Sequence, residues 1–382
     1  MSVTLGEDHI KASSKNWPAH LPPSSSKGIT ILDVAARAGV TPTTVSSALH
    51  GTGRISATLR ERIRKLARDL GYQPKLGARL MRAKQTGQVG LLLPDSDHTK
   101  SGDVSPILSH FVARCEERGL NYHIEFYSSS RDFRPPIQLT SGLIDGLLLG
   151  GYIDAALREW MTAQTRWPWV SIEEPGEYSV ISASDNGIYQ AAQHLAALGH
   201  RQIGYVGGPL LYSTHRLAKK GLEQAVRDFS LDTGNEQWIQ HFDDGRRPDM
   251  LRSTVAWVAD LLRMKRGQRP TAFLCHGIAL ARGVTYEAMR QGLKIPQDLS
   301  LFAVGPSFDT ERALPHLSII DPDFKAMTEQ ALDLLENRIQ GRRIEQPQRV
   351  VIPKLVMYDT VAVPSPWPQN GTAGPKKARE GK

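Results

Sequence analysis

The stretch that decides the fold runs from Gly28 to Thr86, GITILDVAARAGVTPTTVSSALHGTGRISATLRERIRKLARDLGYQPKLGARLMRAKQT. Its apolar residues recur at spacings of three and four, which is the periodicity of one face of an α-helix. The three sets are Ile31, Val34, Ala35 and Ala38, then Val45, Ala48 and Leu49, then Leu59, Ile63, Leu66, Ala67 and Leu70. We therefore expect three short amphipathic helices, with a tight turn at Ala38-Gly39-Val40 that suggests a helix-turn-helix.

Capping residues mark the starts of these helices. Thr30, Thr41 and Ser56 each precede one apolar set, where a hydroxyl can accept a hydrogen bond from an unpaired helical amide. Asp33 stands three residues after Thr30, which is the spacing of a capping box, and Pro42 takes the first position of the second helix. The local signals therefore agree with the periodicity.

Positive charge is concentrated in the same stretch. The whole chain of 382 residues has a formal net charge of +8. Residues 28–86 contain eleven Lys and Arg against three Asp and Glu, so their surplus of eight equals the net charge of the whole chain. A solvated helix face can hold part of such a surplus, but its concentration in one small helical unit favours a polyanion as the partner.

Other functional classes lack their motifs. The sequence has no Gly-x-Ser-x-Gly elbow, no Gly-x-x-x-x-Gly-Lys phosphate loop and no His/Cys cluster with metal-ligand spacing, so we expect no enzyme, no cofactor and no metal. No apolar run approaches a membrane span, and the first residues do not form a secretory signal. Cys115 and Cys275 provide no disulfide framework, as is usual in a reducing interior. We expect a cytoplasmic protein with no membrane partner.

After residue 87 short apolar runs alternate with amphipathic segments. The expected strands are 89–94, 122–127, 144–150, 169–172, 202–207, 271–275 and 299–304, and the expected helices are 107–115, 187–198 and 214–229. This alternation predicts parallel sheets covered by helices on both faces. Roughly 280 residues of it exceed one sheet, so we expect an α/β core of two lobes with a cleft between them. Ligands of such sheets gather at the carboxyl ends of the strands.

Several motifs occur in the order found in one protein family. Thr30-Ile-Leu-Asp-Val-Ala, Gly39-Val-Thr-Pro-Thr-Thr-Val-Ser, Leu70-Gly-Tyr-Gln-Pro and Ala78-Arg79 closely resemble the start of LacI/GalR-family transcriptional regulators. The similarity continues at Ile144-Asp-Gly-Leu, Leu198-Gly-His-Arg-Gln-Ile-Gly and Gly292-Leu-Lys-Ile-Pro-Gln-Asp-Leu-Ser. It covers roughly residues 28–362, which makes it a stronger signal than one short motif.

The resemblance implies both an architecture and a mode of action. It implies an all-α helix-turn-helix headpiece, a hinge helix and a two-lobed core like a periplasmic binding protein. Such a protein binds a palindromic operator in double-stranded DNA as a homodimer, and a small molecule in the cleft of the core modulates its affinity. The chain would cross between the lobes three times, with residues 87–184 and 321–345 in the N-lobe.

We therefore divide the chain into five parts. These are a flexible N-terminal segment at 1–27, a DNA-binding domain at 28–74, a hinge helix at 75–86, the core at 87–363 and a disordered tail at 364–382. The hinge has too few apolar residues to hold a helix alone, so we expect it to fold only against DNA and its two-fold partner. An effector that changes the lobe arrangement would then alter the spacing of the hinges and the operator affinity.

The resemblance also carries DNA contacts to particular positions. In the recognition helix, Pro42, Thr43 and Ser47 match base-reading positions, whereas Thr41, Thr44 and Ser46 match phosphate-contacting or capping positions. Thr30 and His50 complete the predicted contacts of the headpiece. Because Pro42 offers no side-chain hydrogen bond and Ser47 is short, we expect sparse base reading from this helix and more reliance on DNA shape and on the hinge.

The hinge positions Ala78, Arg79 and Met81 match residues that enter the minor groove. The family wedges an apolar side chain between the central base steps there, and we assign this role to Met81, with Leu80 as the alternative. A simpler interpretation is that one of the two only packs against the dimer partner. If Met81 is the wedge, Met81→Ala should cost more operator affinity than Thr43→Ala.

The cleft departs most from the family. Gly305, Ile278 and Ala218 stand where relatives carry two Asp and one Arg that anchor the effector. The remaining candidates for effector binding are Asp95, Ser96, Asp103, Glu173, Tyr212, Arg216 and His276. For each of them a solvated loop position is at least as good an interpretation, and we prefer Arg216 and His276. We assign Asp185 to the lobe crossover, and His200 and Arg201 to a structural turn.

Two functional hypotheses follow. The first is a dimeric DNA-binding regulator, a repressor, whose core either binds an effector or only dimerises. The second is a small-molecule receptor with a vestigial headpiece. Deletion of residues 1–86 distinguishes them, because a receptor would keep its cellular role without them.

Overall fold

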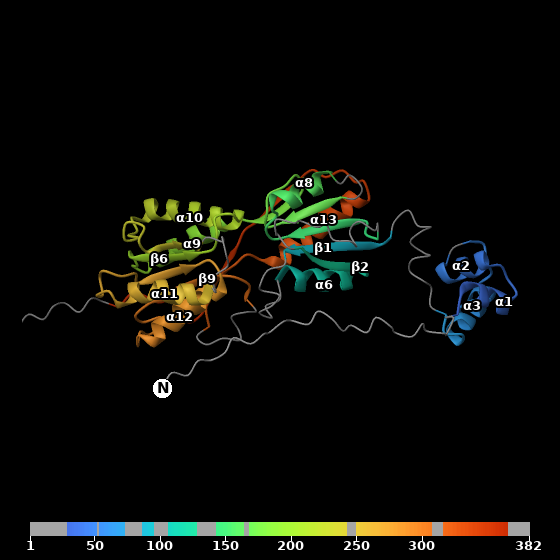
Figure 1. The fold of residues 1–382 in the computed structure, drawn as a ribbon, viewed down its shortest axis with the longest axis horizontal. Coiled ribbons are helices and arrows are strands. Elements are labelled where there is room, and N and C mark those ends of the chain that lie inside the picture. The colour runs from blue at the N-terminus through green and yellow to red at the C-terminus, as the bar shows by residue number, and fades with distance from the viewer. Residues whose placement is uncertain are drawn as a thin grey trace, which may run out of the picture. The chain divides into compact units, whose positions relative to one another are not determined.

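The computed structural model describes residues 29–51, 53–72, 86–94, 106–127, 143–163, 168–242, 250–307 and 316–365. The chain divides into two compact units, Met1–Lys84 and Gln85–Lys382, which we treat separately (Figure 1). The predicted hinge helix lies outside the described residues except for Thr86, and so do the predicted N-terminal segment and the tail after Ser365.

The headpiece contains the three helices that the periodicity predicts. They are α1 Ile31–Ala38, α2 Pro42–His50 and α3 Ala57–Asp69. Thr30, Thr41 and Ser56 are their N-caps, and Thr30 forms the predicted capping box with Asp33. Gly39 ends α1 in the left-handed region at φ 68°, which a side chain would disfavour. The predicted helix-turn-helix is confirmed.

A small core holds these helices together. Val34 of α1, Val45 of α2 and Ile63 of α3 are fully buried against one another. Arg62 on α3 also donates a hydrogen bond from Nη2 to the carbonyl oxygen of Ala38, the last residue of α1. Each buried branched side chain contributes roughly 1.5–3 kcal/mol, so the apolar faces that were read from the sequence supply the stability of the unit.

The second unit consists of two α/β lobes. The N-lobe sheet has the strand order β11-β5-β4-β3-β1-β2, and every pairing in it is parallel. Its strands are β1 Gln88–Pro94, β2 Asn121–Tyr127, β3 Gly146–Gly150, β4 Trp169–Ile172, β5 Ser179–Ser182 and β11 Gln348–Val351. Its helices are α6 Pro106–Arg118, α8 Ala155–Ala163 and α13 Phe324–Ile339. Apolar side chains are buried on both faces, as predicted.

The C-lobe sheet has the strand order β12-β10-β9-β8-β6-β7. Its strands are β6 Ile203–Gly207, β7 Ile239–His241, β8 Ala272–Cys275, β9 Ser300–Val304, β10 Ser318–Asp321 and β12 Lys354–Val356, of which only β12 is antiparallel to its neighbour. Its helices are α9 Ser184–Ala197, α10 Ser213–Phe229, α11 Met250–Arg263 and α12 Ile278–Arg290. Figure 1 shows α9 and α10 on one face of this sheet and α11 and α12 on the other.

The chain crosses between the lobes three times, as expected from the resemblance. The crossings join β5 to α9, β10 to α13 and β11 to β12. One boundary was wrong, because the N-lobe segment expected to end at residue 345 continues through β11 to Val351. Strand β11 pairs with β5, and its four residues are too short and too exposed to stand out as a buried run. The pairing of β11 with β5 therefore places the end of the second N-lobe segment at Val351.

The turn at His200 is structural, as predicted. The buried imidazole bonds Thr271 Oγ1 at 2.9 Å through Nδ1, and through Nε2 it bonds the Ala362 carbonyl at 2.9 Å. Arg201 donates to the Ala196 and His200 carbonyls. The chain remains bonded to the core at Ser365, whose carbonyl accepts from Arg266, so these contacts extend past the boundary predicted at residue 363. Among the described residues, no helix is long and apolar enough to cross a membrane.

Candidate functional site

The start of α2 is built around the Thr41 hydroxyl. Thr41 Oγ1 accepts from the Thr44 amide at 3.2 Å and lies 2.9 Å from Thr44 Oγ1. The cap leaves other amides of the first turn without intrahelical acceptors, because the first turn of every helix has more donors than partners. Thr41, Pro42 and Thr43 are all exposed. This helix end therefore presents donors and a positive dipole end to solvent, as an anion site requires.

The other predicted contacts of the headpiece differ in exposure. Ser47 is partly buried, and its Cβ lies 3.3 Å from the place that a side chain on Gly53 would occupy, so it packs beside that turn. Ser46 is also partly buried. The Thr30 hydroxyl donates to Asp33 Oδ2 at 2.7 Å within the capping box. His50 ends α2, but its side chain lies outside the described residues. Thr43 is thus the predicted base reader with the freest hydrogen-bonding group.

Basic side chains line α3 and the turn before it. Arg54, Arg62, Lys65 and Arg68 are exposed. Arg68 forms an ion pair with Glu61 at 3.3 Å, but both side chains are about two-thirds exposed, so water screens the pair and leaves most of the field of the cations in place. The described part of the headpiece therefore carries a positive surface that attracts a polyanion. The predicted hinge contacts Ala78, Arg79 and Met81 lie outside the described residues.

In the core, the loop after β4 joins the two lobes at the start of α10. The Ser213 amide donates to Glu174 Oε1 at 2.9 Å, and the Ser213 hydroxyl donates to the Glu173 carbonyl at 2.7 Å. Glu174 is only 4 % exposed, so its carboxylate satisfies a helix amide in a nearly dry place. Glu173 was a candidate for effector binding, but its carbonyl holds the lobes together. Burial, followed by the neighbouring Glu174 carboxylate, raises the pKa of its side chain to about 7.

Tyr212 and Arg216 flank this joint. The Tyr212 ring packs edge-on against Tyr152 of the N-lobe, with ring centroids 5.1 Å apart. Arg216 is exposed and donates from Nη1 to the Leu210 carbonyl at 2.9 Å. Both predicted residues therefore lie where the lobes meet. The other three candidates, Asp95, Ser96 and Asp103, lie outside the described residues.

His276 belongs to a histidine cluster at the carboxyl ends of β6, β7 and β8. Its ring lies 4.2 Å from that of His215, and the ring of His241 lies 5.3 Å from that of Tyr205. Burial first, and then the neighbouring imidazoles, lower the pKa of His276 well below its usual value and that of His215 to about 4. The cluster is neutral near pH 7. Among the described residues, no group of His, Cys, Asp and Glu has the arrangement of a metal site.

The three positions that lack the family's polar anchors are filled by apolar packing. A Cβ on Gly305 would lie 2.5 Å from Ile278 Cγ1, so the isoleucine takes up the space that a side chain would need. Ala218 is fully buried against the C-lobe core. An aspartate at Gly305 therefore cannot be added without moving Ile278. At Gly305 and Ile278 the departure from the family is therefore one packing change, and Ala218 is a separate one.

One cavity of about 740 Å³ lies beside the joint. It is lined by α8 and the loop before it, by Glu174, and by the segment that leads into α10. Its lining residues are Tyr152, Ile153, Ala155, Arg158, Glu159, Thr162, Ala163, Glu174, Leu211 and Arg216. The sequence reading missed Arg158, Tyr152 and Glu174. Position after a predicted strand was an available signal for Tyr152, but α8 had not been predicted.

Comparisons with known proteins agree with both units. Residues 30–75 match the model of bacterial regulatory proteins of the lacI family, and residues 192–361 match the periplasmic binding protein-like domain. The HTH-type transcriptional repressor PurR of Klebsiella pneumoniae subsp. pneumoniae is 28% identical over 345 residues, which cover 87% of this chain and 97% of PurR. The HTH-type transcriptional regulator DegA of Bacillus subtilis is 27% identical over 342 residues, with 86% and 96% covered.

Solved structures give the same fold. The lac repressor dimer bound to operator and the anti-inducer ONPF matches with a TM-score of 0.72 at 22% identity, over 88% of this chain and 100% of that chain. The transcriptional regulator CelR in its cellobiose complex matches with a TM-score of 0.61 at 23% identity, over 87% and 100%. Fold and sites thus define a regulator with a helix-turn-helix headpiece and a periplasmic-binding-protein-like core. Residues 30–75 carry the helix-turn-helix of the lacI family of bacterial regulatory proteins, and residues 192–361 carry a periplasmic binding protein-like domain.

Proposed function

We propose that this protein is a repressor that binds a palindromic operator in double-stranded DNA as a homodimer. The observation that carries the proposal is the positive headpiece, whose residues 28–86 hold a surplus equal to the whole net charge of +8 and whose α2 begins at an exposed, capped helix end. Phosphate contacts fix register, and base contacts specify sequence. PurR, the relative named above, is a transcriptional repressor.

The candidate dimer surface is the outer face of α12. Tyr286 and Met289, three residues apart on this helix, are 60 % and 63 % exposed. Large exposed apolar side chains on adjacent helical positions favour burial against another molecule. A second copy of the chain is the occupant that we propose, because a palindromic operator requires a two-fold protein.

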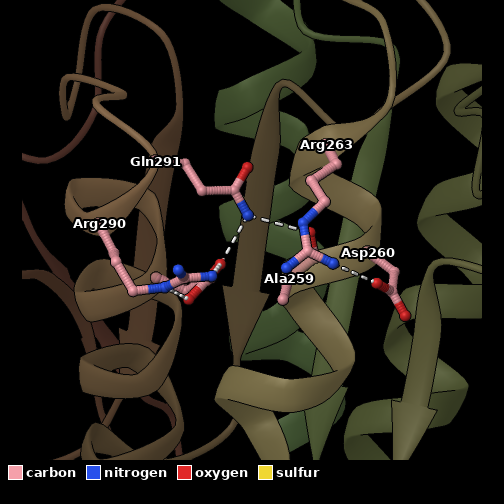
Figure 2. A network of polar contacts seen from close by, with 6 residues as sticks. Ala259, Asp260, Arg263, Arg290 and Gln291 are labelled. Atoms are coloured by element: carbon pink, nitrogen blue, oxygen red, sulfur yellow. Dashed lines mark hydrogen bonds and ion pairs between the residues drawn. The ribbon is translucent and has the colours of Figure 1, made fainter.

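A buried polar network holds this helix in place. Figure 2 shows Arg290 and Gln291 at the end of α12 beside Ala259, Asp260 and Arg263 of α11. The fully buried Glu287 carboxylate accepts two bonds from Arg290, both at 2.7 Å, and one from Gln291 at 2.6 Å. Gln291 also donates to the Ala259 carbonyl at 3.0 Å. Because these bonds fix the end of α12 to α11, they hold Tyr286 and Met289 in a fixed position on the outer face of α12.

The proposal is tested by selecting duplexes from a random-sequence pool with the purified full-length protein. We expect enrichment of a palindrome, and an affinity for it that exceeds that for a scrambled duplex by about a thousandfold or more at moderate salt. The logarithm of the binding constant should fall linearly with the logarithm of salt concentration, since phosphate contacts release counterions. A pool without an enriched palindrome, or equal affinity for scrambled DNA, would contradict the proposal.

The contributions of α2 and of the hinge to operator affinity are compared by measuring variants on the selected operator. We propose contacts from Thr30, Thr41, Pro42, Thr43, Thr44, Ser46, Ser47 and His50 in the headpiece and from Ala78, Arg79 and Met81 in the hinge. Met81→Ala should weaken operator binding more than Thr43→Ala. An apolar wedge between base steps kinks the DNA, and its loss affects the contacts of the whole operator, whereas Thr43 contacts one position. The opposite order would refute this ranking. Leu80→Ala serves as the control for the alternative wedge.

The core is proposed to modulate operator affinity through a small molecule bound where the lobes meet. Tyr212 and Arg216 lie at this place, which supports their assignment. Glu173 also lies there, but it bonds Ser213 through its carbonyl, and His276 lies at the strand ends of the C-lobe. We also propose that the protein acts in the cytoplasm, where its DNA target is found, and that it has no catalytic role. The alternative with a vestigial headpiece predicts no selected motif in the experiment above.

A further inference from the structure

The cavity beside the interlobe joint has a lining that selects a ligand class. Its volume of about 740 Å³ lies within the range of small-molecule sites. Residues from both lobes line it, since Tyr152 and Arg158 belong to the N-lobe and Leu211 and Arg216 to the C-lobe. A ligand in this place touches both lobes. The inference below rests on the proposed function, in which the core responds to a small molecule.

Two guanidinium groups reach this cavity from opposite lobes. Arg158 is exposed on α8, and its Nη1 donates a long hydrogen bond of 3.5 Å to the Pro175 carbonyl. Arg216 on α10 uses Nη1 for the Leu210 and Leu211 carbonyls. Within the described ranges, no carboxylate forms an ion pair with either group. Each guanidinium therefore keeps donors for an incoming anion, because it has five N–H groups in all.

Tyr152 lines the same cavity as the two arginines. Partial burial, and then the Asp154 and Glu174 carboxylates, raise the pKa of Tyr152, while Arg158 and Arg216 act in the opposite direction. Two cations on different lobes thus act electrostatically on the same phenol. The ring itself is held by its edge-on contact with Tyr212 at 5.1 Å. Tyr152, Arg158 and Arg216 thus line one cavity from both lobes.

Two carboxylates also line the cavity. Glu174 Oε1 already accepts a hydrogen bond from the Ser213 amide at the start of α10. Glu159 is an exposed side chain on α8, and water screens its charge as it screens the charges of the exposed Arg158 and Arg216. The rest of the lining consists of Ile153, Ala155, Ala163 and Leu211, which are apolar, and of Thr162. The cavity therefore combines apolar side chains with two arginines that keep free N–H donors.

We propose that this cavity binds a small organic carboxylate with an apolar body. The carboxylate accepts charge-assisted hydrogen bonds from Arg158, Arg216 and the Tyr152 hydroxyl, and the apolar part packs against Ile153 and Leu211. Because the arginines belong to different lobes, the bound anion stabilises one arrangement of the lobes. Like the Glu174–Ser213 hydrogen bond, the ligand would link the N-lobe to the start of α10 in the C-lobe.

The test uses the full-length protein and matched pairs of probes. Each pair is a carboxylate and its primary amide, namely acetate and acetamide, hexanoate and hexanamide, benzoate and benzamide, and indole-3-acetate and indole-3-acetamide. Thermal unfolding is followed with each probe at millimolar concentration, and inorganic phosphate is a further arm. Binding to the folded state raises the melting temperature by mass action.

We expect at least one of the larger carboxylates to raise the melting temperature while its amide and acetate do not. Arg216→Gln and Arg158→Gln should each weaken that carboxylate by about tenfold, and Tyr152→Phe should weaken it by a smaller factor while keeping the ring contact with Tyr212. Arg227→Gln removes an exposed arginine from the far end of α10 and is the matched control, which should bind as the wild type does.

Three outcomes would overturn the proposal. They are no stabilisation by any carboxylate, equal shifts for a carboxylate and its amide, and a shift that persists in both arginine variants. An equal shift with inorganic phosphate would also overturn it, since the apolar lining would then have no role. These measurements contain no DNA, so their failure leaves the operator selection above standing. Conversely, if the protein binds a carboxylate but selects no operator, the proposed regulatory function is refuted and the proposed carboxylate site still stands.

Discussion

At the scale of single residues, the histidine cluster of the C-lobe carries a pH dependence. His215, His241 and His276 all have lowered pKa values, mainly because burial disfavours their charged forms. In the unfolded chain their pKa returns to an ordinary value near 6.5. Between that value and the folded one, the unfolded state binds more protons. The free energy of unfolding is therefore highest above the unfolded pKa and falls as the pH decreases through it.

We expect the core to lose roughly 2 kcal/mol of stability from His215 alone between about pH 7 and about pH 5. Urea denaturation at the two pH values measures this loss. His215→Gln removes the titrating group and should flatten the dependence, although it lowers stability at neutral pH. Asp298→Asn is a control that keeps the cluster and should retain the wild-type slope. A His215→Gln variant with an unchanged slope would contradict the assignment.

Some residues of the proposed effector site could be predicted from the sequence, and others could not. Arg216 and Tyr212 were found because they follow a strand and open a helix, and they line or flank the cavity. Glu173 was selected for its side chain, whereas its carbonyl makes the interlobe bond. Arg158 was missed because α8 was not predicted and because Leu211 and Arg216, the C-lobe residues of the same cavity, lie more than fifty positions away. Only folding brings these groups together.

At the scale of elements, the packing of α9 on α10 depends on one glycine. A Cβ on Gly221 would lie 2.1 Å from the Asp185 carbonyl oxygen, well inside any real contact. Asp185 was assigned to the lobe crossover, and it stands in the first turn of α9, directly after that crossing. The close approach of the two helices thus begins where the chain enters the C-lobe.

Gly221→Ala should therefore destabilise the core, in spite of the better helix propensity of alanine. Because the clash is with backbone, the helices must move apart, and we expect a loss of about 2–4 kcal/mol in urea denaturation. Lys220→Ala changes the exposed neighbouring position on α10 and should alter stability by less than about 0.5 kcal/mol. Equal stabilities for the two variants would refute the packing argument.

At the scale of the whole molecule, dimerisation connects the core to DNA binding. Tyr286 and Met289 project from α12, which the Glu287 network holds against α11. Replacing both by glutamate places two charges in the proposed interface, and an unpaired buried charge costs several kcal/mol. We expect the double variant Tyr286→Glu, Met289→Glu to be monomeric in analytical ultracentrifugation and to lose affinity for the palindrome by about a hundredfold or more.

Met357→Glu is the matched control for this experiment. Met357 is 44 % exposed and also belongs to the C-lobe, but it follows β12 rather than lying on α12. The control should remain dimeric and bind the operator as the wild type does. Thermal unfolding of the double variant checks that its core is intact. A dimeric double variant would place the interface on another face.

The sequence by itself determined the headpiece, the layered α/β core and the family. Helix periodicity, hydroxyl caps and Pro42 are local signals, and they specified α1, α2 and α3 because the bonds they describe close within four residues. The longer buried strands were predicted from the same kind of signal. By contrast β5, β7, β10, β11 and β12 were not predicted, because each has only three or four residues and begins or ends with a polar side chain, unlike the equally short β4 and β8.

Only the tertiary structure decided the parts that depend on distant residues. It set the N-lobe boundary at Val351, joined Glu174 to Ser213 and assembled His215, His241 and His276. It also placed Ile278 against Gly305, so that apolar packing fills two of the three positions that lack an anchor. The physical reason is common to all of these. Sheet pairing, burial and charge convergence join residues far apart along the chain, and no local pattern encodes which of them will meet.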